Sequence, residues 1–348
     1  MELTGDIETF LKRLFEAHGF TVETDGSHLD QGFDLKLRAP SGRASVVEIK
    51  LYRTKRVDFD TLSRAISQVE IFAAQAGVHD GVLVITSQLS RTDRMTADVA
   101  APNVLVLDHD ALTGLAAVSE PLALELQKIL RDVLIAPITI DPSNPILVNT
   151  LAQIKKPLLG AQVRTPPRAR NNRGELLCQE LDAISTGKPG WKQFEAKATE
   201  ALKYAFEGHI AQWRAQKSTT TALHRFDLIG RIVSSHEYWK TLAADFQSRY
   251  VVFEFKNDTY RIKQGHIHST EKYLFRTALR SIAVIVCRTG TDKNADAAIR
   301  GAIRESGKLI VSITTNQLCK MLKMKDVGDD PTNEVMDLID QFMMSLER

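Results

Sequence analysis

The sequence predicts an α/β protein in which one order of helices and strands is used twice. Amphipathic helical patterns alternate with short apolar runs along most of the 348 residues. A proline-rich, basic stretch at 136–176 interrupts this alternation and predicts a linker between a first domain at 1–135 and a second domain at 177–348. At typical domain sizes, a chain of this length forms two domains, each able to bury its own core.

The first domain is expected to begin with a helix, because apolar residues recur at helical spacing from Ile7 to Phe15. Gly19 follows as a helix stop signal. Residues 40–42, Pro-Ser-Gly, predict a turn between two paired strands. In chain order the patterns predict strands at 33–38 and 44–52, a helix at 58–77, strands at 81–86 and 103–108 with a helical stretch between them, and a helix at 122–134.

The second domain is expected to repeat this plan. A predicted helix at 191–206 precedes a strand-like segment at 223–232, as the leading helix precedes the first strand pair of the first domain. The remaining patterns predict a helix at 235–249, strands at 249–257 and 282–287, a helix at 269–280, a helix at 295–305, a strand at 308–313 and a final helix at 332–347.

Composition places the protein among ordinary globular chains, since 43% of its residues are hydrophobic and 25% are charged. A formal net charge of +2 decides little about partners, because acidic metal ligands offset basic phosphate-contacting residues. The scattered Cys178, Cys287 and Cys319 fit neither a zinc site nor a disulfide framework. The N-terminus has no signal-peptide pattern, and no apolar stretch is long enough to span a bilayer. We expect a cytoplasmic protein without a membrane partner.

Two apolar strands each end in a Glu-x-Lys pair. Residues 251–257 read VVFEFKN and residues 46–52 read VVEIKLY. Because strand residues two apart point the same way, Glu254 and Lys256 share one face of their strand, as do the corresponding acid and lysine of the first domain. An isolated pair of this kind usually serves solubility on an edge strand.

Further acids accompany both pairs. An aspartate opens the preceding strand in each domain, Asp34 in GFDLKL and Asp227 in RFDLIG. A glutamate lies on each leading helix, Glu8 in the first domain and Glu195 in the second. Carboxylates gathered at the margin of an apolar core are costly to bury unless a cation accompanies them. Mg²⁺ suits such a site, because it takes one or two carboxylates together with water and phosphate oxygens.

This order of helix-Glu, strand-Asp and Glu-x-Lys resembles the PD-(D/E)xK, or restriction endonuclease-like, nuclease superfamily, and the first domain resembles its Mrr-type branch. The resemblance implies that each domain is a central mixed β-sheet flanked by helices. It implies that Mg²⁺, with Mn²⁺ as an alternative, is held by an acid pair and a backbone carbonyl in each domain. The implied catalytic residues are Glu8, Asp34, Glu48, Lys50, Glu195, Asp227, Glu254 and Lys256, and the implied metal ligands are Asp34, Glu48, the Ile49 carbonyl, Asp227, Glu254 and the Phe255 carbonyl.

The sequence departs from the family pattern in two ways. The position before each aspartate is Phe33 or Phe226 rather than proline. A predicted helix also separates Asp227 from Glu254, whereas a short turn separates the corresponding acids of the first domain. The second match is therefore the weaker of the two.

Basic residues follow the first Glu-x-Lys pair at once. Arg53, Lys55 and Arg56 lie in LYRTKRVDF, and Arg64 lies on the next predicted helix. Such a local excess fits contacts to backbone phosphates, although a solvated loop has the same composition. Gln68, on the same helix, resembles the glutamine that Mrr-like members place near the site.

The sequence therefore predicts a Mg²⁺-dependent endonuclease that cleaves DNA, with RNA remaining open, and the resemblance suggests bacterial restriction or anti-phage defence. A homodimer or partner proteins of a defence system are the expected assemblies. Two alternatives stay open: a nucleic-acid-binding or sensing module with one or both domains inactive, and a structural subunit of a larger complex. His266 and His268 offer two metal ligands without an evident third, so we interpret them as ordinary histidines.

Overall fold

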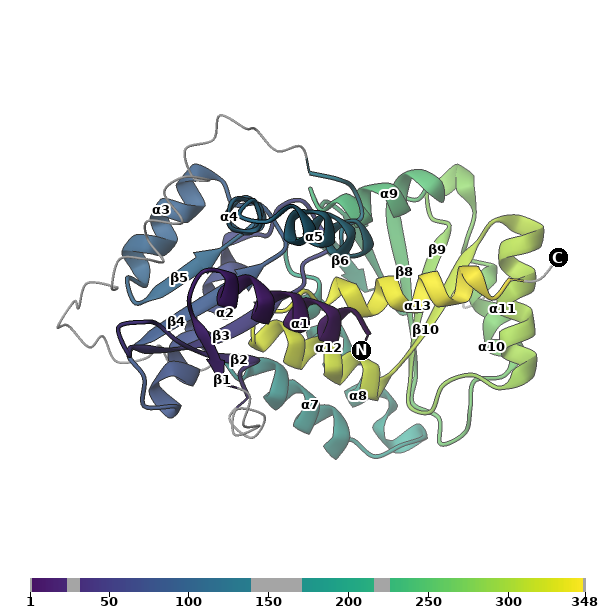
Figure 1. Ribbon diagram of the computed structural model, residues 1–348. Coiled ribbons are helices and arrows are strands. Elements are labelled where there is room, and N and C mark those ends of the chain that lie inside the picture. Colours follow the sequence, from purple (N-terminus) through teal and green to yellow (C-terminus); the bar gives the residue numbers. More distant parts are fainter. Residues whose placement is uncertain (1, 24–31, 139–170, 216–225, 347–348) are drawn as a thin grey trace. The chain divides into compact units, whose positions relative to one another are not determined.

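The computed structural model describes residues 2–23, 32–138, 171–215 and 226–346, with side chains from residue 5 onward. The protein divides into two compact units, and each is described by itself (Figure 1). The first unit comprises Met1–Asn171 with Val327–Asp329, and the second comprises Asn172–Asp326 with Asp330–Arg348.

After an initial helix and three strands, the first unit alternates helices and strands and ends in two helices. Acidic side chains begin two of its helices: Asp58 and Asp108 each accept a hydrogen bond from a backbone N–H of the first turn. Its elements are α1 (Glu2–Ala17), β1 (Thr21–Glu23), β2 (Leu35–Arg38), β3 (Ala44–Lys50), α2 (Phe59–Gln75), β4 (Asp80–Ile85), α3 (Arg91–Ala100), β5 (Val104–Leu107), α4 (His109–Ala116) and α5 (Glu120–Val133).

The first sheet is mixed and has the order β1-β2-β3-β4-β5. The pairs β1–β2 and β2–β3 are antiparallel, whereas β3–β4 and β4–β5 are parallel. Alternate side chains of β3 pack into two different cores, because successive side chains of a strand point to opposite faces of the sheet. Val47 and Ile49 pack with α1, α4 and α5, and Val46 packs with α2 and α3 on the other face. Helices therefore cover both faces of this sheet (Figure 1).

The second unit adds helices at its start and end to a similar plan. Asp292 begins its helix α11 by accepting a hydrogen bond from the N–H of Ala295. Its elements are α7 (Arg173–Ala183), η1 (Lys188–Gly190), α8 (Trp191–Ala205), β6 (Ile210–Ala215), β7 (Leu228–Ile232), α9 (Glu237–Asp245), β8 (Tyr250–Lys256), α10 (Gln264–Glu271), η2 (Arg276–Ala278), β9 (Ile282–Cys287), α11 (Lys293–Ser306), β10 (Leu309–Thr314), α12 (Thr315–Asp326) and α13 (Thr332–Met344).

The second sheet repeats the pairing of the first. Its order is β6-β7-β8-β9-β10, with two antiparallel pairs followed by two parallel pairs. Val251, Phe253 and Phe255 pack into a core with α7, α8, α9, α12 and α13, while Val252 faces a smaller core with α10 and α11. The predicted fold class is therefore confirmed: two mixed sheets of five strands, each flanked by helices (Figure 1).

The helix predicted at 269–280 is wrong. The helix of this region, α10, ends at Glu271, and the chain then passes through η2 to Leu279, which has φ +53°. The apolar residues of this stretch do not form a buried face: Leu274 is buried, whereas Phe275 is exposed and its ring is covered by the Arg280 guanidinium at 4.3 Å. Turn geometry and cation–π contact therefore replace the expected helix.

Other elements also differ from the sequence patterns, and the helices α4 and α12 were not predicted. The strands β1 and β6 were not predicted, because β1 has only three residues and β6 carries few buried side chains. Helix α7 begins at Arg173, inside the stretch 136–176 assigned to a linker, and 139–170 of that stretch lies outside the described residues. None of the helices in the described ranges is long and apolar enough to cross a membrane.

Candidate functional site

The first carboxylate site forms where β2 meets β3. The N–H of Asp34, just before β2, donates to the carbonyl of Val47 at 3.0 Å. In return, Asp34 Oδ2 accepts a hydrogen bond from the N–H of Ile49 at 2.7 Å. These two bonds place the aspartate beside the end of β3, where Glu48 and Lys50 share one face of the strand.

Glu48 lies in this site with one oxygen paired and the other unpaired. Lys50 Nζ lies 3.0 Å from Glu48 Oε1. Among the described residues, the buried Glu48 Oε2 has no hydrogen-bond partner. Burial raises the pKa of Glu48 to about 7 and that of Asp34 to about 6, and the neighbouring lysine only partly opposes this. A buried carboxylate oxygen without a partner is costly, so the site favours a cation.

Asp329, in the segment Val327–Asp329 of the first unit, adds a further acid to this site. Its Oδ1 lies 3.1 Å from Lys50 Nζ. Burial lowers the pKa of Lys50, but Asp329 and Glu48 outweigh burial, so the pKa is raised and the ammonium form is favoured. Gly328 has φ +77°, and a Cβ there would lie 2.3 Å from the backbone nitrogen of Ala65. Only glycine fits this turn beside Asp329.

Two more predicted residues of the first unit belong to helices next to the site. Glu8 on α1 is half-buried, and its charge contributes to the raised pKa of Asp34, after burial. Gln68 lies on the inner side of α2 and is only 5% exposed. A buried amide is a less common feature than the exposed glutamine typical of helix surfaces.

The second carboxylate site has the same backbone geometry. Asp227 Oδ2 accepts a hydrogen bond from the N–H of Phe255 at 2.8 Å, just before β7 meets β8. Lys256 Nζ lies 2.9 Å from Glu254 Oε2. The buried Glu254 Oε1 has no hydrogen-bond partner among the described residues. Burial raises the pKa of Glu254 to about 7, against the opposing effect of Lys256.

The surroundings of the second site differ from those of the first. The side chain of Lys256 is 23% exposed, compared with 4% for Lys50. Burial lowers the pKa of Lys256, but the charge of Glu254, with those of Asp227 and Asp258, outweighs it and raises the pKa. Glu195 is half-buried on α8, and its charge is not among the main causes that set the pKa values of Glu254 and Lys256. Its place in the site stays a prediction.

Both acid pairs consist of oxygen donors suited to a divalent ion. Each offers two carboxylates at one strand margin, one of them with a buried, unpaired oxygen. Hard oxygen donors of this kind are what Mg²⁺ and Mn²⁺ prefer. The carbonyls of Ile49 and Phe255 belong to the same strands, and their role as ligands stays a prediction.

The predicted phosphate-binding residues lie in and after the loop that follows β3. The loop backbone is fixed: the carbonyl of Arg53 accepts from the N–H of Ile135, and that of Lys55 accepts from the N–H of Gln88. Arg56 is exposed, while Arg53, Lys55 and Arg64 are half-buried. No described contact identifies a ligand for them, so nucleic-acid binding by these residues stays a prediction.

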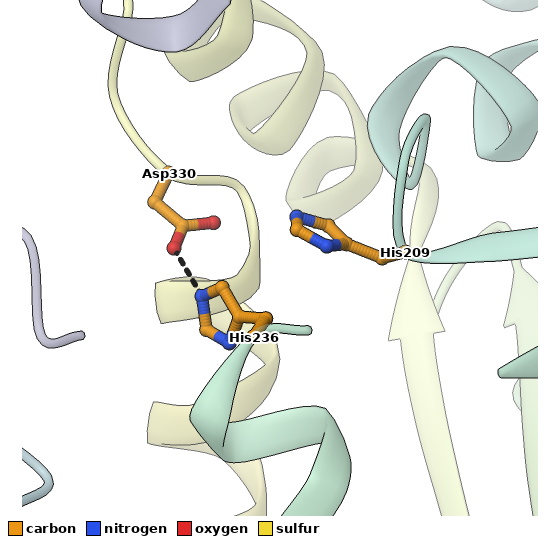
Figure 2. Close-up of side chains that lie close together, drawn as sticks. All are labelled: His209, His236 and Asp330. Carbon is orange, nitrogen blue, oxygen red and sulfur yellow. Dashed lines mark hydrogen bonds and ion pairs between the residues drawn. The ribbon is translucent and has the colours of Figure 1, made fainter. Parts of the chain in front are cut away.

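Sequence reasoning missed two features of the sites. Asp329 lies far along the chain from Lys50 and belongs to no recognisable motif. A second group, His209, His236 and Asp330, converges in the second unit from three distant segments (Figure 2). His266, considered earlier as a metal ligand, instead accepts the N–H of Lys263 at the start of α10. Within the described residues, no group of three metal ligands includes His266 or His268.

Comparison with known proteins finds similarity in the first unit. Residues 4–116 match the family model Mrr_cat, described as a restriction endonuclease. An 80.3 kDa protein of Escherichia coli (strain K12), attributed to transposon gamma-delta, is 31% identical over 88 residues, which are 25% of this chain and 12% of that protein. This chain therefore spans only a small part of that relative's length.

Two solved structures of the restriction endonuclease FokI are similar to this chain at low scores. The first has a TM-score of 0.31 and 10% identity, covering 46% of this chain and 29% of that chain. The second, FokI bound to DNA, has a TM-score of 0.33 and 9% identity, covering 77% of this chain and 52% of that chain. At such TM-scores the fold assignment rests on the sheet topology described above.

Proposed function

We propose that this chain, whose residues 4–116 match the restriction endonuclease model Mrr_cat, is a metal-dependent endonuclease that hydrolyses phosphodiester bonds of DNA. The observation that supports this most is the repeated pairing of a strand-opening aspartate with a buried Glu-x-Lys. In both units the aspartate accepts the N–H between the glutamate and the lysine, and one glutamate oxygen stays unpaired.

The residues of each site have distinct roles in this proposal. Asp34 with Glu48, and Asp227 with Glu254, would hold Mg²⁺ or Mn²⁺, together with the carbonyls of Ile49 and Phe255. When bound, the ion supplies a Lewis acid for the phosphoryl oxygens and acidifies a water molecule.

The lysines supply fixed positive charge beside each acid pair. Both ammonium groups lie about 3 Å from a glutamate oxygen. Each can turn a donor towards the attacking water or a phosphoryl oxygen, where it stabilises developing charge. Glu8 and Glu195 on the leading helices are proposed to complete the acidic shells, and Glu8 is close enough to act on Asp34.

DNA is the proposed substrate, and Arg53, Lys55, Arg56, Arg64 and Gln68 are proposed to contact it beside the first site. Contacts to backbone phosphates provide affinity without sequence specificity. We place the activity in cytoplasmic restriction or anti-phage defence on the basis of the family alone. A homodimer, or partner proteins of a defence system, would be the working assembly.

A second candidate function applies to the second unit. The side chain of Lys256 is more exposed than that of Lys50. If only one unit cuts DNA, this difference favours the second unit as the one that recognises nucleic acid without cutting it.

The proposal is tested by a cleavage assay on the purified full chain. Supercoiled plasmid, linear DNA and RNA are incubated with Mg²⁺, with Mn²⁺ and with a chelator. We expect cleavage of DNA that requires the metal and is lost in the Glu48→Ala/Glu254→Ala variant. The control is Glu16→Ala/Glu305→Ala, which removes one exposed helical glutamate from each unit. Unchanged cleavage by the Glu48→Ala/Glu254→Ala variant would reject the proposal, and cleavage of RNA alone would change the substrate.

A further inference from the structure

A polar cluster in the second unit is separate from the acid pair of that unit. His209 lies in the turn between α8 and β6, His236 immediately precedes α9, and Asp330 lies just before α13 (Figure 2). One ligand atom of each of the three residues lies within 4.8 Å of those of the other two. Three distant segments of the chain therefore present two imidazoles and a carboxylate to one point.

The spacing of these atoms is close to that around a tetrahedral ion. His236 Nε2 lies 2.9 Å from Asp330 Oδ2, and the largest separation in the group is within 4.8 Å. Ligands about 2.0–2.1 Å from a tetrahedral Zn²⁺ are about 3.4 Å apart. Shifts of about an ångström or less, which side-chain rotation supplies, would bring all three atoms to bonding distance of a common ion.

Neighbouring groups orient the possible ligands. Ser234 Oγ accepts the N–H of His236 at 2.9 Å and lies 2.8 Å from His209 Nδ1. If that Nδ1 carries the proton and donates to the hydroxyl, the lone pair of His209 lies on Nε2, which faces Asp330 in Figure 2. The N–H of Thr332 donates to Asp330 Oδ1 at 2.8 Å, which leaves Oδ2 towards the cluster. Histidine and carboxylate ligands of metals are held by outer hydrogen bonds of this kind.

One aromatic ring outside the cluster, that of Trp239, packs against it. The ring of His209 stacks on Trp239 with an interplanar angle of 27°, and it meets the ring of His236 edge-on at 5.0 Å. The side chains of His236 and Asp330 are only 8% and 10% exposed. The carboxylate of Asp330 and the imidazole of His236 therefore lie in a largely buried place.

His236 also has an unsatisfied atom. Its buried Nδ1 has no hydrogen-bond partner among the described residues, while its Nε2 contacts Asp330. An ion at the cluster would bind Nε2, so Nδ1 would stay outside its coordination shell. The convergence of His209 and His236 on the same carboxylate is the feature that favours a common ion.

We propose that His209, His236 and Asp330 bind one divalent cation of borderline softness, with Zn²⁺ preferred and a water molecule as the fourth ligand. Two imidazoles and one carboxylate suit Zn²⁺, whereas Mg²⁺ selects oxygen ligands. Because the three ligands precede β6, α9 and α13, the ion would join three segments of the second unit and stabilise it. The site is independent of the proposed cleavage chemistry, which uses other side chains.

The proposal is tested by Zn²⁺ binding to the full chain. Glu48→Gln/Glu254→Gln serves as the background, so that the carboxylate sites compete little for the ion. After chelator treatment and equilibrium dialysis, we expect one Zn²⁺ per chain by elemental analysis. Adding His236→Gln or Asp330→Asn should weaken binding at least about tenfold, since even loss of an outer-shell partner costs this much. The control, His266→Gln/His268→Gln, removes two histidines of the same unit and should leave the ion bound.

A second measurement uses the background protein alone and needs no substitution of the three proposed ligands. In the background protein, Zn²⁺ should raise Tm with the logarithm of its concentration, and Mg²⁺ should not. Co²⁺ in its place should show visible absorption of a low-coordinate site with imidazole ligands. The proposal is overturned if the background protein retains no Zn²⁺ and its Tm does not respond, or if His236→Gln retains Zn²⁺ as tightly as the background. Either outcome leaves the nuclease assay unaffected, so the two proposals fail separately.

Discussion

The two units share a backbone plan but enclose their lysines differently. In both, an aspartate before an antiparallel strand accepts the N–H inside the Glu-x-Lys of the next strand. Lys50 is 4% exposed and contacts Glu48 and Asp329, whereas Lys256 is 23% exposed and contacts Glu254. Strand pairing therefore fixes the acids in both units, while segments outside the sheet determine how closed each site is.

The largest expected effect comes from removing both lysines. Lys50→Ala/Lys256→Ala should lower DNA cleavage about 10²–10³-fold or more, because a preorganised donor beside developing charge is lost in both sites. Mg²⁺ should still stabilise the variant against heat, since the acids remain. Lys240→Ala, on an exposed position of α9, is the control and should cleave as the wild type does. Full cleavage by the double lysine variant would show that neither lysine has the proposed role in cleavage.

The raised pKa values predict how pH changes the stability of the metal-free protein. Glu48 and Glu254 have a pKa of about 7 in the folded state, against about 4.5 when exposed. Between these values the folded state binds more protons, so the free energy of unfolding falls as pH rises towards about 7. Each shift corresponds to about 3 kcal/mol as an upper estimate. Urea unfolding in chelator from pH 5 to pH 8 measures this loss.

Added Mg²⁺ and substitution of the two glutamates make this pH test more specific. Mg²⁺ should restore much of the stability at pH 8, because it pairs with the ionised acids. Glu48→Gln should flatten the pH dependence in part, and Glu48→Gln/Glu254→Gln should flatten it further, since the amide does not ionise. A pH profile that is the same for wild type and the double variant would show that these glutamates do not titrate as described.

A smaller effect is expected from the acid that distinguishes the first site. Asp329→Asn should destabilise the chain by about 1 kcal/mol, because it removes one of two carboxylates that face the buried Lys50. Asp258→Asn is the matched change near Lys256, where the aspartate acts only as a more distant charge. It should cost less. Urea unfolding at pH 8 compares them, and an equal cost for both changes would remove this difference between the units.

The smallest expected effect concerns the exposed basic loop beside the first site. Arg56→Ala should weaken DNA binding a few-fold and reduce the slope of log affinity against log salt by about 1, as loss of one phosphate contact does. Arg131→Ala, at an exposed position of α5 in the same unit, is the control. Fluorescence anisotropy in chelator at several salt concentrations measures both. If wild type and Arg56→Ala have the same slope of log affinity against log salt, Arg56 does not contact DNA.

Much of the fold could be predicted from the sequence because its strands are marked by apolar runs. The two Glu-x-Lys strands and their opening aspartates were visible because side chains two apart on a strand share a face. The helix predicted at 269–280 was wrong, because Phe275 is covered by Arg280 rather than by the core. The spacing of apolar residues cannot show whether a side chain packs into the core or against a neighbouring arginine.

The remaining site residues could not be predicted, because nothing in local spacing links them. Asp329 reaches Lys50, and Asp330 reaches His236, from a short segment between α12 and α13. Only the folded chain brings these partners together. Strand periodicity indicates which residues share a face, but it carries no information on contacts made by distant turns.

The central claim, that each unit carries its own metal-dependent cutting site, is tested most directly by single-site variants on supercoiled plasmid. Time courses in Mg²⁺ compare wild type, Glu48→Gln, Glu254→Gln and the double variant. We predict that each single variant still nicks the plasmid at a reduced rate and that the double variant does not. Complete loss in one single variant, with a wild-type rate in the other, would contradict the claim and leave one unit without cutting activity.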